Sequence, residues 1–281
     1  MDAEYKQVFQ PQTLQELFSI WHRLPMAVLY GGGTNLNRSS GKKHTLELPS
    51  TIISMDRIPE LRAFTRTERY IEIGSMIKFN EILNVEKMLP PAFAQAIIDI
   101  AGPEVRNLAT IGGNICNPTR HSDAAAPLIA LDARYELRSA QNARWISASR
   151  FSGSSAFLSM NPQEVLTRIR IPLEQWHYSV YKKFENHFSE NEYGGAVVFL
   201  ARIQKNIVTD IRIVYAGNIV LRDKDSEAAL SGKHYPLEKR DASHFMELWE
   251  TYLASEGNLP FLTKIKMLGF IESSLRDLSD Y

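Results

Sequence analysis

Two glycine-rich segments contain the residues of this sequence with the clearest chemical potential. The first, residues 29–36, reads LYGGGTNL and follows the apolar run MAVLY. Consecutive glycines leave backbone N–H groups without steric cover and permit positive φ, and such amides can converge on an anion. Thr34 and Asn35 add short polar side chains beside them. Taken alone, this segment is explained more simply as a strand followed by a turn.

The second segment, residues 101–133, strengthens the anion-binding interpretation. Gly112 and Gly113 are preceded by Thr110 and followed by Asn114, and Asp123 comes nine residues later at the start of a predicted helix. Two glycine-rich donor loops in one domain suit a ligand with two phosphates. A carboxylate is a good acceptor for the hydroxyls of a ribose or ribityl chain. Asp123 is equally well explained as an acidic residue that favours a helix macrodipole.

Other phosphate-binding and hydrolase motifs do not fit. A Rossmann fingerprint counted from Gly31 requires glycine where Leu36 stands, and a Walker A loop ending at GKK requires it there too, with Ser or Thr in place of Lys43. There is no G-x-S-x-G elbow, and no two histidines have the spacing of zinc ligands on one helix face. Zinc hydrolase chemistry is therefore unsupported.

Composition narrows the class of protein further. A chain of 281 residues is long enough for two or three domains, and its zero net charge gives no indication of nucleic-acid or membrane binding. A single cysteine, Cys116, excludes an internal disulfide and a Cys-ligated iron–sulfur cluster, and we interpret it as a packing residue. The polar N-terminus and the lack of a run of about 20 apolar residues predict a cytoplasmic protein that does not span a membrane.

The periodicity of apolar residues predicts two different parts of the chain. The first part alternates helices and strands, and the second has three strands followed by three helices, which is typical of a separate α+β domain. A hairpin turn is expected at Lys205-Asn206. The predicted helices are 13–24, 78–89, 91–102, 122–133, 225–232, 241–255 and 260–278, and the predicted strands are 26–30, 45–48, 51–55, 70–75, 134–139, 144–147, 164–172, 178–184, 195–204 and 207–218.

The segments YGGGTNL and VRNLATIGGN…SDAAAPLIALDA resemble the FAD-binding subunit of the molybdenum hydroxylases. That family includes xanthine dehydrogenase and the medium subunit of carbon monoxide dehydrogenase. The resemblance covers almost the whole chain and is most specific at TIGGN. It implies an α+β fold: a PCMH-type FAD-binding domain of two α/β subdomains at 1–174, split near residue 60, and a C-terminal domain of the carbon monoxide dehydrogenase flavoprotein type at 175–281, with a three-stranded antiparallel sheet and a helical bundle.

The resemblance also implies FAD as the cofactor, without a catalytic residue or a metal ligand. The pyrophosphate would lie against both glycine segments, with an apolar residue at position 100 near the flavin and an acidic contact at position 123. Without the resemblance, the lysine at position 182 would be interpreted as a solvent-facing strand residue. The implied cofactor contacts are Leu29, Tyr30, Gly31, Gly32, Gly33, Thr34, Asn35, Leu36, Ile100, Thr110, Ile111, Gly112, Gly113, Asn114, Asp123, Leu166 and Lys182.

The function implied by the family is electron transfer within a complex. The expected partners are a molybdopterin-binding large subunit and a small 2Fe–2S iron–sulfur subunit, with electrons passing through FAD to NAD or another acceptor. The sequence departs from the family where Glu185, Glu190 and Glu192 stand in place of a basic run, which weakens the case for nicotinamide recognition. The first segment also has three glycines where the family usually has two.

Two alternative functions remain open at this stage. A stand-alone FAD oxidoreductase would be expected to carry a His or Cys for covalent flavin attachment, or a longer substrate domain, and His121 is the only nearby candidate. A binding module that has lost flavin would keep the same fold, although the intact TIGGN argues against it.

Overall fold

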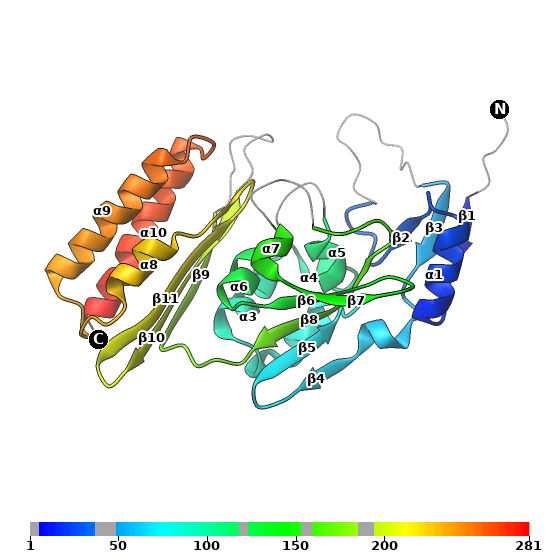
Figure 1. The fold of residues 1–281 in the computed structure, drawn as a ribbon, viewed down its shortest axis with the longest axis horizontal. Helices are drawn as coiled ribbons and strands as arrows, with labels where there is room; N and C mark the ends of the chain where they lie inside the picture. Colours follow the sequence, from blue (N-terminus) through cyan, green and yellow to red (C-terminus); the bar gives the residue numbers. More distant parts are fainter. Residues whose placement is uncertain (1–5, 37–48, 118–122, 153–158, 185–193, 281) are drawn as a thin grey trace.

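The computed structural model describes residues 6–36, 49–117, 123–152, 159–184 and 194–280. Several features singled out above lie outside these ranges: the strand predicted at 45–48, His121, and Glu185, Glu190 and Glu192. The described residues form three sheets that follow one another along the long axis of the molecule (Figure 1).

The N-terminal sheet is small and parallel, with the order β1 (Gln7–Phe9), β3 (Thr51–Ser54), β2 (Val28–Tyr30). Helix α1 (Leu14–Arg23) crosses between β1 and β2, and the Thr13 hydroxyl caps it by accepting from the N–H of Glu16. Leu17 of α1 and Ile53 of β3 are fully buried in the same cluster. The first glycine segment overlaps the end of β2, and its three glycines follow directly after Tyr30.

The middle sheet is antiparallel and has the order β4 (Phe64–Arg66), β5 (Tyr70–Gly74), β8 (Val165–Pro172), β6 (Arg134–Arg138), β7 (Ala143–Ser147). Buried residues such as Ile73 and Ile169 pack against helices on one face. The associated helices are η1 (Pro59–Arg62), α2 (Phe79–Leu83), η2 (Glu86–Met88), α3 (Pro91–Ile98), α4 (Pro103–Arg106), α5 (Ile111–Ile115), α6 (Ala125–Ala130) and α7 (Ala148–Ser152). The single helix predicted at 78–89 is therefore two short helices, interrupted at Asn84, a residue of low helix propensity.

The C-terminal sheet is antiparallel with the order β12 (Val220–Leu221), β11 (Ile207–Ala216), β10 (Gly195–Gln204), β9 (Tyr178–Phe184). The predicted three strands are thus four among the described residues, because the chain turns after β11 and two residues pair back with it. The turn at Lys205-Asn206 is confirmed, with φ of +50° and +58° at these residues. Helices α8 (Lys224–Leu230), α9 (Lys239–Ser255) and α10 (Phe261–Asp280) cover one face.

Both faces of the C-terminal sheet are buried, so it forms a central layer between two groups of helices (Figure 1). Val197 and Phe199 face α8–α10, whereas Ala196 and Val198 belong to the core that contains α3 and α6. From β11, the Arg212 guanidinium donates to the carbonyl of Ala130, at 2.8 Å, at the end of α6. A hydrogen bond and apolar packing thus join the last third of the chain to the helices of the middle sheet.

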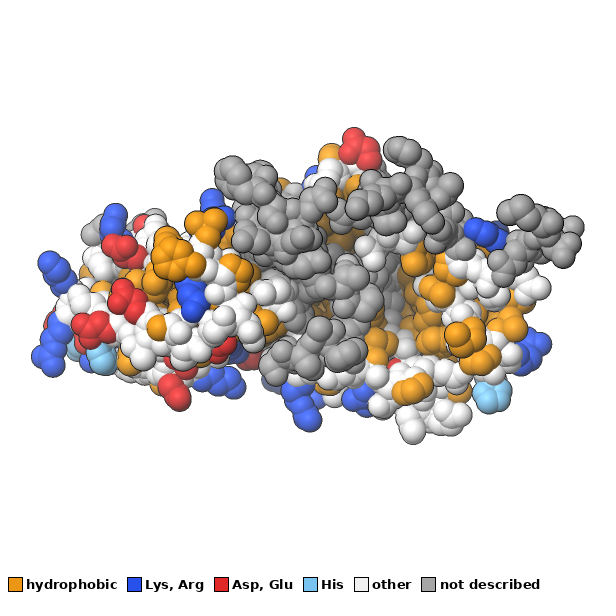
Figure 2. All heavy atoms as spheres, turned by 90° about the horizontal axis from the view of Figure 1, so that it is seen from above, with side chains coloured by type: hydrophobic (Ala, Val, Ile, Leu, Met, Phe, Trp, Pro, Cys, Tyr) orange, Lys and Arg blue, Asp and Glu red, His pale blue; other side chains and the backbone are white. Residues whose placement is uncertain are grey.

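The surface seen from above shows hydrophobic side chains at both ends of the molecule (Figure 2). The large exposed hydrophobic residues include Phe261, Leu262 and Ile265 at the start of α10. Within the described ranges, no helix combines the length and the apolar run that a membrane span requires.

Candidate cofactor site at the glycine-rich loops

The first glycine loop lies directly against the second. A Cβ atom on Gly32 would overlap the backbone carbonyl oxygen of Leu108, and one on Gly31 would lie 3.0 Å from Oγ1 of Thr110. Gly33 has φ +69°, a left-handed conformation that favours glycine. In the described part of the chain, the N–H groups of Gly31, Gly32 and Gly33 donate to no residue. This loop therefore presents unused donors beside the start of α5.

The second loop has a different construction, because its N–H groups are used inside the protein. The N–H of Ile111 donates to the carbonyl of Ile77 (3.1 Å), that of Gly112 to the carbonyl of Ser75 (2.8 Å), and that of Gly113 to Oγ1 of Thr110 (3.1 Å). A Cβ atom on Gly112 would lie 2.6 Å from Cβ of Ser75. The expectation that both loops offer free amides is wrong for the second loop, whose glycine at position 112 permits close packing.

Buried polar atoms without a partner occur at several places in the described residues, and those of Ser75 and Asn114 belong to the second loop and the strand end that it packs against. Oγ of Ser75, Oδ1 of Asn114 and the hydroxyl of Tyr181 are buried and have no hydrogen-bond partner among the described residues. A buried polar atom without a partner costs free energy. A ligand with several hydrogen-bonding groups would remove this cost. Ser75 and Tyr181 are therefore candidate ligand contacts that the sequence did not indicate.

The turn that contains the apolar residue Ile100 is held in place by the guanidinium group of Arg106. Ile100 is buried, and the next residue, Ala101, has φ +46°. Nη1 of Arg106 donates to the carbonyls of Ile98 (2.7 Å), Ile100 (3.1 Å) and Ala101 (2.7 Å). The segment VRN was part of the motif, but only the structure shows that its arginine fixes this turn.

Asp123 forms an ion pair that the sequence did not predict. Nζ of Lys183 lies 2.7 Å from Oδ2 of Asp123 and donates to the carbonyl of Asp99 at 3.1 Å. Helix α6 begins at Ala125 without a side-chain cap, so Asp123 does not cap it. The acidic residue thus links the second loop region to β9.

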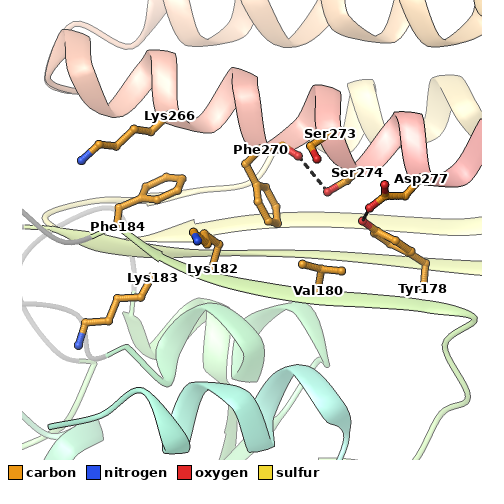
Figure 3. Close-up of a pocket in the computed structure, with 10 residues that line it drawn as sticks. All are labelled: Tyr178, Val180, Lys182, Lys183, Phe184, Lys266, Phe270, Ser273, Ser274 and Asp277. Atoms are coloured by element: carbon orange, nitrogen blue, oxygen red, sulfur yellow. Dashed lines mark hydrogen bonds between the residues drawn. The ribbon is translucent and has the colours of Figure 1, made fainter.

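Lys182 lies on the other face of β9. It is exposed and lines a groove of about 510 Å³ between β9 and α10, beside Phe184 and Phe270 (Figure 3). Figure 3 also shows Lys183 directed away from α10. The structure therefore does not bring Lys182 together with the glycine loops, whereas its neighbour Lys183 contacts Asp123 and the carbonyl of Asp99.

The remaining predicted contacts lie close to the glycine loops and differ in their exposure to solvent. Leu166 of β8 is 3% exposed and shares a core cluster with Ile100 and Ile111. Asn35 and Leu36 are exposed at the end of the described part of the first loop. Leu29, Tyr30 and Thr34 are half-buried.

Cys116 behaves as a packing residue. Its Sγ lies 3.9 Å from Sδ of Met160. Removal from water raises the pKa of the Cys116 thiol to about 12, so the reactive thiolate is disfavoured at neutral pH. This agrees with an interpretation in which the single cysteine has no chemical role.

Comparison with known families decides the class of this site. Residues 3–174 match the family described as "FAD binding domain in molybdopterin dehydrogenase". The chain belongs to this family. FAD is accordingly its cofactor, and its relatives are subunits of xanthine and carbon monoxide dehydrogenase-type oxidoreductases.

Individual relatives support the same assignment. The chain is 30% identical over 163 residues to the putative xanthine dehydrogenase FAD-binding subunit XdhB of Escherichia coli strain K12, which covers 57% of this chain and 55% of that protein. It is 29% identical over 200 residues to the carbon monoxide dehydrogenase medium chain of Hydrogenophaga pseudoflava, covering 69% of each. The match thus spans about half the length of the first relative.

A solved structure shows the same fold. The carbon monoxide dehydrogenase of Hydrogenophaga pseudoflava contains a chain that matches with a TM-score of 0.78 at 24% identity. The match covers 99% of this chain and 97% of that chain. The C-terminal layer, which the family model does not cover, is therefore part of the shared fold.

The residues present fit the FAD expected in this family. The first loop offers unused N–H donors, and Ser75, Asn114 and Tyr181 offer buried polar atoms without partners among the described residues. The carboxylate of Asp123 is a suitable acceptor for a hydroxyl group. Ile100 and Leu166 supply apolar surface nearby. Amide, hydroxyl and carboxylate groups beside apolar walls suit a cofactor with phosphates, hydroxyls and a ring system.

Proposed function

We propose that this chain is the electron-transfer subunit of a molybdenum hydroxylase complex. The observation that carries the proposal is the group of unpartnered buried polar atoms beside two touching glycine loops, in a chain of an FAD-binding family. The partners would be a molybdopterin-binding large subunit and a small 2Fe–2S subunit. Bound FAD would supply redox chemistry between the iron–sulfur clusters of a partner and NAD or another acceptor.

The residues of this chain would bind and orient the cofactor, and none needs to act as a general acid or base. The N–H groups of the first loop, with Thr34, would donate to the pyrophosphate. Thr110 and Asn114 would add polar contacts from the second loop, and Asp123 would accept from a hydroxyl group. Ile100 would contribute to an apolar wall that excludes water from the flavin ring.

The domain division follows from the same proposal. We place the FAD-binding domain at 1–174, with its subdomains divided near residue 60, between the parallel sheet and the start of β4 at Phe64. The C-terminal domain would be 175–281. The segment between β8 and β9 contains Trp176, whose ring makes cation–π contacts with the guanidinium groups of Arg202 (4.6 Å) and Arg212 (4.7 Å). Its conformation is therefore fixed by cation–π contacts.

The first test is the identity of the bound flavin. The protein purified with its partners should be yellow and should release FAD, not FMN, when it is denatured. Finding FMN or a nicotinamide nucleotide as the tightly held ligand would contradict a site for a dinucleotide flavin. A flavin that stays attached after denaturation would favour the stand-alone oxidoreductase, and a colourless protein that takes up no FAD would favour the flavin-free module.

The second test is the dependence of flavin reduction on the partners. Stopped-flow absorbance should show reduction of the flavin by a hydroxylase substrate only when the molybdenum and iron–sulfur subunits are present. An artificial reductant should bleach the flavin of the isolated chain once FAD is bound. Turnover of a hydroxylase substrate by this chain alone would contradict the assignment as a subunit.

A substitution of Asp123 tests its assigned role. Asp123→Ala should weaken FAD binding by about 1–3 kcal/mol, the range for loss of a charge-assisted hydrogen bond. Asp225→Ala is the matched control, because Asp225 is an acidic residue in the first turn of α8. Equilibrium flavin titration should separate the two variants. Unchanged FAD affinity with a small loss of thermal stability in both would show that Asp123 does not contact the cofactor.

A further inference from the structure

We infer that two residues on one face of β9 form the C-terminal domain's share of the FAD site, with Lys183 positioning Asp123 and the Tyr181 hydroxyl contacting the cofactor. The inference rests on the proposed function. It replaces the contact expected at Lys182 with contacts from the residues on either side of it.

The pairing of β9 with β10 decides which side chains share a face. Tyr181 pairs with Val198 and Lys183 with Ala196, whereas Lys182 pairs with Val197. Side chains of directly paired residues lie on the same face of a sheet. Ala196 and Val198 pack in the core that contains α3 and α6, and Val197 packs towards α8–α10. Tyr181 and Lys183 therefore face the FAD-binding domain, and Lys182 faces away from it.

Lys183 is held by two acceptors from that domain. Its side chain is 25% exposed, and its Nζ contacts Oδ2 of Asp123 and the carbonyl of Asp99. An ammonium group that binds one carboxylate oxygen fixes the rotamer of that carboxylate. Oδ1 of Asp123 accepts from no described residue. Lys183 thus presents Asp123 with one oxygen engaged and the other available to a cofactor hydroxyl.

Tyr181 supplies a donor that the protein itself does not use. The residue is 7% exposed and its hydroxyl has no partner among the described residues. Burial, together with the carboxylates of Asp123 and Asp99, raises the pKa of Tyr181, so the phenol stays protonated and can donate. An oxygen atom of the cofactor is the kind of acceptor that would satisfy it. Because Tyr181 and Lys183 are two residues apart on one face of β9, the phenol lies beside the ammonium group that binds Asp123 and the carbonyl of Asp99.

These polar residues would couple cofactor binding to the packing of the two domains. Tyr181 and Lys183 belong to the C-terminal sheet, whereas Asp99 follows α3 and Asp123 precedes α6. A ligand that contacts both sides stabilises the state in which the sides are packed together. FAD should therefore raise the melting temperature of the whole chain through these residues, and loss of Lys183 should reduce that increase.

The experiment is a flavin titration of the full chain, in complex with its partners, for four single variants. Lys183→Met should raise the Kd for FAD by on the order of tenfold, because a mispositioned carboxylate loses a charged hydrogen bond. Lys183→Arg should recover most of the affinity. Tyr181→Phe should raise the Kd by roughly fivefold, the effect of one hydrogen bond, without lowering the melting temperature of the cofactor-free protein. Lys182→Met, the control on the opposite face, should leave both quantities unchanged.

A double substitution distinguishes positioning from direct contact. If Lys183 acts through Asp123, then Lys183→Met should have little further effect on FAD affinity in an Asp123→Ala background. A wild-type protein that binds no FAD would overturn both this inference and the proposed function. A wild-type protein that binds FAD, with Lys183→Met and Tyr181→Phe equal to it, would overturn only this inference. Weaker binding by Lys182→Met, with Lys183→Met unaffected, would overturn it as well.

Discussion

The two glycine loops look alike in sequence but are built for different purposes. In the first, the N–H groups of Gly31, Gly32 and Gly33 donate to no described residue, so the loop presents donors. In the second, the N–H groups of Gly112 and Gly113 are bonded to Ser75 and Thr110 within the protein. The first loop leaves its backbone N–H groups without a described acceptor, and the second uses its backbone to hold itself in place.

The two loops nevertheless lack side chains at Gly32 and Gly112 for the same physical reason. A Cβ atom on Gly112 would meet Ser75 and one on Gly32 would meet Leu108, so both glycines permit contact between protein segments. The second loop offers polar side-chain groups instead of backbone N–H groups, namely the hydroxyl of Thr110 and the side-chain amide of Asn114. Substitutions in both loops can therefore separate effects on folding from effects on cofactor binding.

Gly112→Val should have the largest effect and should act on the fold. The new side chain would have to displace Cβ and the carbonyl oxygen of Ser75, 2.6 and 2.7 Å from the position of its Cβ atom. Overpacking of this kind costs about 3 kcal/mol. Chemical denaturation of the cofactor-free protein should show the loss. An unchanged free energy of unfolding with abolished FAD binding would instead indicate that this glycine faces the cofactor.

Gly32→Ala should show whether the packing of the first loop against the second depends on glycine. Its Cβ would overlap the carbonyl of Leu108, so the free energy of unfolding should fall by about 1–3 kcal/mol and FAD affinity should fall with it. Gly257→Ala is the control, because no atom lies within 4 Å of the position of its Cβ. Equal stability of the two variants, measured by thermal melts, would mean that contact between the loops does not depend on glycine.

Ser75→Ala should lower FAD affinity without lowering the stability of the cofactor-free protein. Its Oγ has no partner among the described residues, so its removal should leave the cofactor-free protein as stable or more stable, while FAD affinity falls by about 0.5–1.5 kcal/mol. In the control, Ser226→Ala, a buried hydroxyl bonded to Asp223 is lost, which should lower stability and leave FAD affinity unchanged. A loss of stability in Ser75→Ala without an effect on FAD would refute the assignment of this hydroxyl to the cofactor.

Gly113→Ala should have the smallest effect on the fold. The residue is exposed, and its Cβ would meet only Oγ1 of Thr110, at 3.0 Å. The free energy of unfolding should change by less than about 1 kcal/mol, the difference in helix propensity between glycine and alanine. Any fall in FAD affinity would then report on the cofactor itself. A destabilisation as large as that of Gly112→Val would remove the distinction between the two glycines.

The elements were predictable wherever short-range chemistry decides them. The turn at Lys205-Asn206 and the helix start at Thr13 depend on residues within a few positions, and both are present. The extra strand β12 has only two residues, so no periodicity indicated it. The interruption at Asn84 depends on one residue of low helix propensity, which the periodicity of the apolar residues does not register.

The orientation of the lysines on β9 could not be predicted, for a physical reason. In YSVYKKF, Tyr181 and Phe184 are buried on opposite faces, because the strand lies between two cores. Alternation of apolar and polar residues identifies a buried face only when the other face of the sheet is exposed to solvent. The lack of hydrogen-bond partners for the hydroxyls of Ser75 and Tyr181 could not be predicted from the sequence either. The partners of a side chain depend on residues far apart in the chain.

The burial of both faces of the C-terminal sheet has a consequence for the synthesis of this chain. Ribosomes add roughly 5–20 residues per second, and the strands that cover α3 and α6 end only at Ala216. After the last residue of the FAD-binding domain has emerged, its apolar surface therefore stays uncovered for seconds. A ribosome that stalls near residue 174 would therefore leave a product whose apolar surface on α3 and α6 is exposed to solvent.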